Sequence, residues 1–166
     1  MPDTPKLIKL DAQRIIGLSR VMSFADDKTS LLWQSFMPRR REIEHTKNVD
    51  FISLQLYPEK FMSSGFNVHL LFEKWAAVAV SENAVPPEGM KELTIPEGMY
   101  AIFDHQGPAN EFQRTTNYIY NKWLPDSDFI LDNRPHYEVL PDGYNPRDDD
   151  ATEQVFIPIK KPGGAS

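Results

Sequence analysis

The chain has 166 residues, of which 40% are hydrophobic, and a formal net charge of −6. This length suffices for one domain with a hydrophobic core, and the apolar content excludes a wholly disordered chain. The negative charge argues against direct binding to nucleic acid, which needs clustered Lys and Arg side chains. The absence of cysteine excludes disulfides, thiolate metal sites and cysteine nucleophiles.

The N-terminal residues lack the basic-then-apolar pattern of a secretion signal. The longest apolar stretches fall far short of the ~20 residues that a membrane-spanning helix needs. We therefore expect a cytoplasmic protein that does not enter the membrane. We also expect residues 1–160 to form a single domain and residues 161–166 to form a flexible C-terminal tail.

The first half of the chain alternates strand-like and helix-like patterns. Three strands are predicted, over residues 13–24, 53–57 and 72–81. Thr29 or Ser30 can cap a helix that begins at Leu31. Pro38 is expected to kink this helix or to divide it in two, because proline lacks a backbone N–H and clashes with the preceding turn.

The second half repeats this order of elements. Three more strands are predicted, over residues 99–105, 135–140 and 153–160. A helix with one apolar stripe is predicted over residues 109–123. The order β-α-β-β thus occurs twice, and it predicts an α+β domain. Two similar halves should form one antiparallel sheet with both main helices on one face.

Four segments in the second half resemble a known family. They are residues 95–108, which end in His-Gln-Gly-Pro, residues 119–125, which end in Trp-Leu-Pro, residues 134–138, which read Pro-x-aromatic-Glu from the second residue, and residues 155–159, with an internal proline. In this order they resemble the GyrI-like effector-binding family. This bacterial family includes a gyrase-inhibitory protein and the drug-binding halves of multidrug-responsive transcription activators.

The resemblance implies a pseudo-twofold pair of β-α-β-β units with a ligand cleft between them, and a link to transcription regulation. The sequence departs from the family in two respects. Leu140 stands where family members often carry a tyrosine, two residues after the glutamate. The chain also has no room for the helix-turn-helix domain of the activators, so we expect no DNA-binding domain.

Glu138 is the main candidate for a binding residue. In a strand, Glu138 shares one face with His136 and Leu140. A carboxylate in a low-dielectric setting has a raised pKa or needs a cation to neutralise it. The resemblance implies the second case, with Glu138 at the bottom of an aromatic pocket that binds amphipathic, cationic or aromatic small molecules. Without the resemblance, an exposed strand glutamate is the simpler interpretation.

Several aromatic residues are candidates for the walls of this pocket. They are Trp75, Tyr57, Phe156, Trp33, Phe103 and Tyr100. Each of them taken alone is more often a core residue than a pocket residue. Trp75 and Tyr57 have polar neighbours in the sequence and are the stronger candidates.

No metal or cofactor is predicted. The four histidines show no close metal-ligand spacing, and the sequence contains no nucleotide-binding or nucleophile-elbow motif. The basic run at residues 39–41 is interpreted as a solvated helix face, because Glu42 follows it directly.

Three functions stay open from the sequence. The first is a binding module that sequesters or senses small molecules. The second is a hydrolase, since the resemblance extends to stand-alone proteins that hydrolyse cyclopropane-bearing genotoxins, and Glu138 would then be the catalytic residue. The third is an inhibitor that engages gyrase as a protein partner. Exposed sheet edges also leave room for a homodimer.

Overall fold

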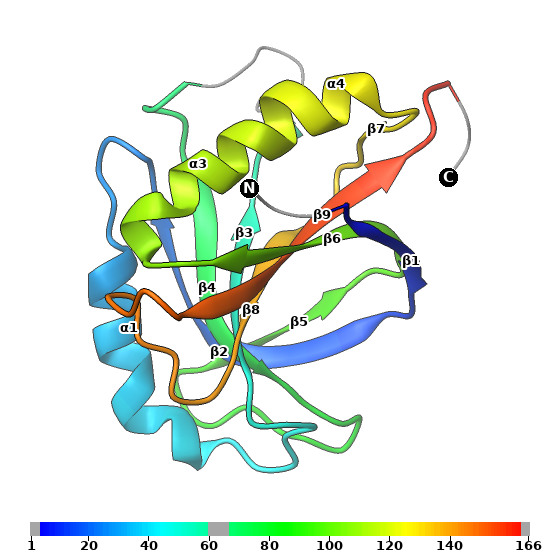
Figure 1. Ribbon diagram of the computed structural model, residues 1–166. Coiled ribbons are helices and arrows are strands. Elements are labelled where there is room, and N and C mark those ends of the chain that lie inside the picture. The colour runs from blue at the N-terminus through cyan, green and yellow to red at the C-terminus, as the bar shows by residue number, and fades with distance from the viewer. Residues whose placement is uncertain (1–3, 60–66, 164–166) are drawn as a thin grey trace.

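A computed structural model of the chain describes residues 4–59 and 67–163, so the last three residues of the predicted C-terminal tail lie outside it. The strands are β1 (Lys6–Leu10), β2 (Gln13–Met22), β3 (Phe51–Leu56), β4 (Phe72–Ala79), β5 (Lys91–Ile95), β6 (Gly98–Gln106), β7 (Ile130–Leu131), β8 (His136–Leu140) and β9 (Thr152–Lys160). The helical segments are α1 (Thr29–Phe36), η1 (Met37–Glu42), η2 (Ala109–Glu111), α3 (Phe112–Tyr118), η3 (Ile119–Trp123) and α4 (Leu124–Asp126) (Figure 1).

The described strands form one antiparallel sheet in the order β1-β6-β9-β8-β3-β4-β2-β5, with β7 paired to β9. The order β2-β4-β3 in the first half corresponds to β6-β9-β8 in the second, and the halves meet where β3 pairs with β8. The predicted α+β fold with duplicated β-α-β-β units is therefore confirmed.

Three strands were not predicted, namely β1, β5 and β7. Strand β1 precedes the first unit but pairs with β6 of the second, and β5 precedes the second unit but pairs with β2 of the first. Each half thus contributes an edge strand to the other half. This exchange ties the two halves together by backbone hydrogen bonds at both ends of the sheet.

The helical segments overlap the predicted ranges. The predicted cap is wrong, because α1 begins at Thr29, two residues before Leu31, with Lys28 at the N-cap position and no side-chain cap hydrogen bond. Helix α1 ends at Phe36, and Pro38 lies in the first turn of the 3₁₀ segment η1. Of the two effects expected of this proline, a kink or a division, the structure shows a division into an α-helical and a 3₁₀ segment. The second helix contains the π-helical segment η3 and continues through Pro125 to Asp126. In the described residues, no helix has the length and apolar character needed to cross a membrane.

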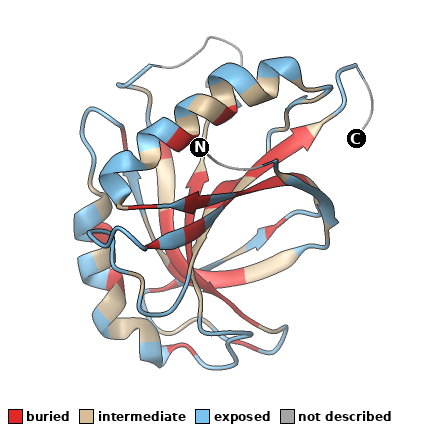
Figure 2. Cartoon of the chain, in the orientation of Figure 1, coloured by how far each residue is buried: buried red, intermediate tan, exposed pale blue. Residues whose placement is uncertain are grey.

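Both helices cover the same face of the sheet. Helix α1 packs on a buried cluster that includes Ile16 and Ala76, and the segment α3-η3 packs on a second cluster that includes Phe103 and Val155. A third cluster lies on the opposite face. Figure 2 shows buried positions concentrated on the central strands, while the outer sides of the helices are exposed.

Candidate functional site

A group of polar side chains lies on the helix-bearing face, at the centre of the sheet where the two halves meet. The register of β3 and β8 pairs Ser53 with Glu138, and Gln55 with His136. Their cross-strand neighbours on β4 and β9 include members of the clusters beneath α1 and beneath α3-η3. The polar group therefore occupies the strip of sheet between the two helices.

Glu138 is partly exposed at the centre of this strip. Its Oε1 atom accepts a hydrogen bond from Gln55 Nε2 at 3.2 Å. Burial raises the pKa of Glu138 to about 7, although the positive charge of Lys74 lowers it, and the negative charge of Glu153 raises it further. Near neutral pH the carboxyl group is thus only partly ionised, and a cation beside it would favour the charged form.

Glu153 is a second carboxyl group on the same face. It lies on β9 two residues from Val155, which is the cross-strand partner of Glu138, so the two glutamates are diagonal neighbours. Glu153 is buried, and its Oε2 atom accepts a hydrogen bond from the Tyr144 hydroxyl at 2.8 Å. Burial also raises the pKa of Glu153.

Two tyrosines and a histidine stand beside the glutamates. The Tyr120 hydroxyl lies 2.9 Å from His136 Nδ1, and the Tyr57 ring lies edge-on to the His136 ring at 5.0 Å. Burial lowers the pKa of His136 to about 3, so its imidazole is neutral. Burial first, with the nearby Glu138 charge contributing, raises the pKa of Tyr57 and Tyr120, so both hydroxyls stay protonated. These three neighbours of Glu138 are therefore aromatic and uncharged, and the charges that act on Glu138 are those of Lys74 and Glu153.

Three of the predicted wall residues lie on the helix-bearing face. Tyr57 adjoins His136 and also packs against Phe72 at 5.2 Å. Trp33 of α1 lies edge-to-face with Phe51 at 6.2 Å, on the side of the strip that α1 covers. Phe103 is fully buried beneath the second helix and therefore belongs to the core.

The other three predicted wall residues lie on the opposite face. Trp75 and Tyr100 belong to the apolar cluster there, and Phe156 stacks on Tyr137 at 4.5 Å beside it. Trp75 faces away from Glu138 because it alternates with Lys74 and Ala76 along β4. The structure thus separates Trp75 from Tyr57, which the sequence analysis had grouped together.

Several residues of the site were not singled out from the sequence. They are Ser53, Gln55, Lys74, Tyr120, Tyr144 and Glu153. Strand alternation could have grouped Gln55 with Ser53 and, separately, Lys74 with Ala76. No sequence signal joins Tyr144, which lies in the loop between β8 and β9, to Glu153.

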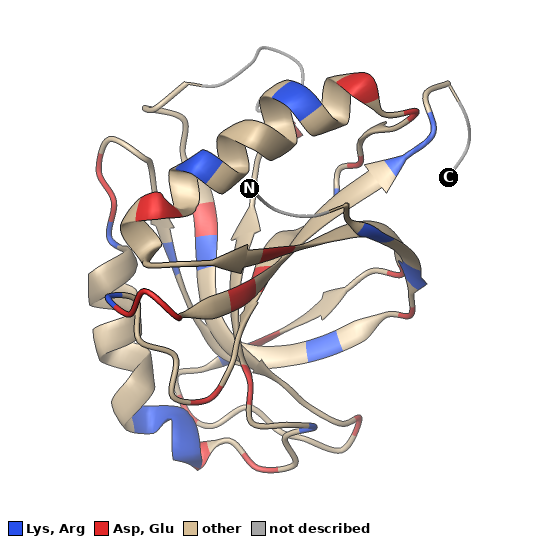
Figure 3. Cartoon of the chain, viewed as in Figure 1, with Lys and Arg blue, Asp and Glu red and all other residues tan. Residues whose placement is uncertain are grey.

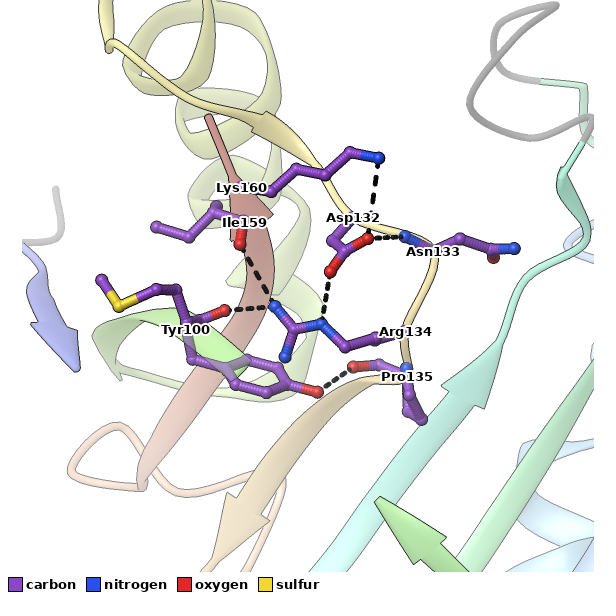
Figure 4. Close-up of polar contacts among 8 residues, drawn as sticks. Tyr100, Asp132, Asn133, Arg134, Pro135, Ile159 and Lys160 are labelled. Atoms are coloured by element: carbon purple, nitrogen blue, oxygen red, sulfur yellow. Dashed lines mark hydrogen bonds and ion pairs between the residues drawn. The ribbon is translucent and has the colours of Figure 1, made fainter. Parts of the chain in front are cut away.

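The loop before β8 is anchored by Arg134, as Figure 4 shows. Arg134 Nε pairs with Asp132 Oδ2 at 2.6 Å. Its Nη2 atom donates to the carbonyl oxygens of Met99 on β6 and Ile159 on β9. One buried guanidinium therefore holds the loop against two strands of the sheet.

Tyr100 completes this anchor from β6. The Arg134 guanidinium lies over the Tyr100 ring at 4.7 Å, and the Tyr100 hydroxyl donates to the Pro135 carbonyl at 2.8 Å. Pro135 directly precedes His136, the first residue of β8. The anchor thus fixes the backbone from which His136 and Glu138 project, although Tyr100 itself lies on the other face.

The basic run at residues 39–41 lies in η1, at the end of α1 (Figure 3). Arg39 pairs with Glu42 through Nε and Oε2 at 2.9 Å, and Arg40 donates to the Met37 carbonyl at 2.6 Å. These contacts bind two of the three arginines to neighbouring groups of the protein. In the part of the chain that the structure describes, no cluster of His, Asp and Glu is arranged to hold a metal ion.

Residues 3–160 match the family model of the GyrI-like small molecule binding domain. The chain is also 25% identical over 159 residues to the transcriptional regulator BrlR of Pseudomonas aeruginosa. That match covers 93% of the chain and 54% of the regulator, so the chain spans about half the length of this curated relative.

Solved structures share the fold. SAV2435, solved bound to tetraphenylphosphonium, has a TM-score of 0.70 and 14% identity, over 94% of this chain and 93% of that one. The C-terminal domain of EcmrR has a TM-score of 0.70 and 15% identity, over 97% and 99% of the two chains. The family model spans nearly the whole chain, and the two TM-scores of 0.70 show that these structures share its overall fold. The protein therefore belongs to the GyrI-like family of small-molecule-binding domains.

Proposed function

We propose that the protein binds amphipathic organic cations on the helix-bearing face of the sheet, over β3 and β8, with Glu138 as the anionic contact. The observation that carries this proposal is the partly exposed Glu138 carboxyl group, held among tyrosines and with its pKa raised to about 7 by burial. A carboxylate in this setting gains from a nearby cation, which offsets the cost of removing its charge from water.

The tyrosines supply the remaining affinity for such a ligand. A cation over the face of an aromatic ring gains about 0.5–2 kcal/mol. Tyr57 and Tyr120 adjoin His136, two residues before Glu138 on the same strand face. SAV2435, which shares the fold, was solved bound to tetraphenylphosphonium, a lipophilic cation, and this supports the same ligand class here.

Ligand binding can serve one of two purposes. The similarity to the transcriptional regulator BrlR supports the sensing of a compound, and the alternative is sequestration of that compound in the cytoplasm. A gyrase partner and a homodimer stay predictions. The contacts among the described residues favour neither of these two predictions.

A titration of the purified protein with tetraphenylphosphonium, and with a rhodamine followed by fluorescence, tests the proposal. We expect micromolar dissociation constants, roughly −8 kcal/mol. Glu138→Gln keeps the size of the side chain but removes its charge, so it should weaken cation binding by about 1–3 kcal/mol. A neutral analogue such as triphenylphosphine oxide should be affected much less.

Glu97→Gln is the matched control, because Glu97 is exposed between β5 and β6 and its loss changes the net charge equally. It should leave the affinity unchanged. Absence of saturable binding to the wild-type protein at millimolar ligand would reject the proposal.

Hydrolysis is the second candidate, because a carboxyl group with a pKa of about 7 is suited to act as a general base at neutral pH. In this case Glu138 would take a proton from a water molecule whose oxygen attacks a cyclopropane carbon. The new C–O bond would form as a ring C–C bond breaks, and the electron pair of that bond would then take the proton back from Glu138. Glu138→Gln would then leave binding intact and lower turnover about 100-fold or more. Measuring both affinity and product formation with one variant separates the two functions.

A further inference from the structure

Lys74 lies on the same face as Glu138, on the opposite side of β3. The register pairs Gln55 with Lys74 on β4 and with His136 on β8. Gln55 also donates a hydrogen bond to Glu138, so a single residue of β3 stands between the cation and the carboxyl group. Lys74 is only partly buried, as is Glu138.

The ammonium group of Lys74 has no direct partner in the described residues, where it makes neither an ion pair nor a side-chain hydrogen bond. Its charge nevertheless reaches both carboxyl groups, because it lowers the pKa of Glu138 and of Glu153. By contrast, Arg134 is committed to a close ion pair with Asp132. Lys74 thus acts on both glutamates from a distance and is not locked to either.

The other side chains at the site add no compensating charge. His136 is neutral, and the hydroxyl groups of Tyr57 and Tyr120 stay protonated. Arg20 is the neighbour of Lys74 on β2, but it is exposed to solvent, which screens its charge. With both glutamates ionised, the site therefore carries two negative charges and one positive charge.

We infer that Lys74 is a specificity-determining residue, which restricts the site to organic cations of a single positive charge. The ammonium group of Lys74 balances one of the two negative charges of Glu138 and Glu153, and the ligand balances the other. The inference rests on the proposed cation binding and names the charge class of its ligand. In a partly buried site, unbalanced charge is costly, and a like charge placed against a ligand rejects it. A dication would therefore meet the repulsion of Lys74, whereas a monocation completes the balance.

The test compares two ligands, tetraphenylphosphonium and the bis-quaternary dication dequalinium, on four proteins. These are the wild type, Lys74→Met, Lys74→Arg and Lys9→Met. Lys74→Met removes the charge and keeps the apolar stem. Lys9→Met removes an exposed lysine of β1, so it controls for the change in the net charge of the protein.

We expect Lys74→Met to raise the affinity for the dication, relative to the monocation, by about tenfold or more. Lys74→Arg keeps the charge and should keep the wild-type ratio, and Lys9→Met should change the ratio less than about threefold. Adding Glu153→Gln to Lys74→Met should abolish the gain, because one negative charge is then lost.

The outcomes separate the two levels of the proposal. A wild-type protein that binds neither ligand overturns both the cation-binding function and this inference. A wild-type protein that binds tetraphenylphosphonium, with a ligand ratio that Lys74→Met leaves unchanged, overturns the inference alone. If Lys74→Met does not fold, as thermal melting would show, Lys74→Gln replaces it in the same comparison with the same expected ratio.

Discussion

Gly98 lies directly against the guanidinium group of Arg134, so that a Cβ atom at position 98 would come within 2.5 Å of Arg134 Cζ. The backbone of Gly98 also has a φ of +154°, which side-chain-bearing residues rarely adopt. Gly98 begins β6, and Arg134 anchors the loop that leads into β8. The contact between Gly98 and Arg134 thus helps to position the loop before β8, the strand that carries Glu138, although it lies away from the polar strip.

This contact predicts that Gly98→Ala displaces Arg134 and lowers the free energy of unfolding by about 1–3 kcal/mol, the cost of overpacking a closed site. Chemical denaturation measures this loss. In an Arg134→Ala background the same substitution should cost less, because the clashing group is gone. Equal costs in both backgrounds would show that the strain at Gly98 does not arise from Arg134.

Glu138→Gln is expected to stabilise the unliganded protein at alkaline pH. The pKa of Glu138 is raised to about 7 from an ordinary value of 4.5, so the folded protein holds the proton more tightly than the unfolded chain. This contribution to stability is fully present below pH 4.5 and is lost as the pH rises through about 7.

The Glu138→Gln variant lacks this ionisation. Its free energy of unfolding minus that of the wild type should therefore be about 1–3 kcal/mol larger at pH 8 than at pH 4.5. Urea unfolding at the two pH values provides the comparison. A difference that does not change with pH would mean that Glu138 titrates normally.

The affinity for a monocation should fall in acid. The ligand favours the ionised carboxylate, so below a pH of about 7 it must displace a proton from Glu138. We expect the dissociation constant to rise as the pH falls from 8 to 5, approaching tenfold per pH unit below the pKa. Calorimetric titrations at several pH values test this, and Glu138→Gln should flatten the profile. A wild-type profile as flat as that of the variant would contradict the assignment.

Tyr120 should contribute through its ring more than through its hydroxyl group. Tyr120→Phe removes the hydrogen bond to His136, and it should lower the free energy of unfolding by about 1 kcal/mol. The affinity for tetraphenylphosphonium should change little. Tyr120→Leu also removes the ring face and should weaken binding by about 0.5–2 kcal/mol. Equal affinities of the two variants for tetraphenylphosphonium would show that the Tyr120 ring does not contact the ligand.

Trp75 should affect stability and not ligand affinity, because it is buried on the face opposite to Glu138. Trp75→Phe should lower the free energy of unfolding by about 1–3 kcal/mol through lost packing. Ligand titration of the folded variant should reproduce the wild-type dissociation constant. A large loss of affinity with unchanged stability would place Trp75 at the ligand.

Local patterns in the sequence were sufficient for the main elements of the fold. The apolar stripe of residues 109–123, the proline at position 38 and the alternation in the six principal strands are patterns that can be read within a short stretch of the chain. The doubled order of these elements then led to the sheet with two helices on one face. Strand alternation likewise placed Glu138 and His136 on a common face without knowledge of the tertiary structure.

Only the tertiary structure decided which side chains meet across strands. Alternation shows that Trp75 and Lys74 point in opposite directions, but the pairing register decides which of them shares a face with Glu138. The exchange of β1 and β5 between the halves depends on long-range hydrogen bonds that a short strand pattern does not specify. The approach of Tyr144 to Glu153 depends on the path of a loop. Glu138 could be named as a candidate from the sequence because of the family resemblance, whereas the charges and rings around it come from segments that only folding brings together.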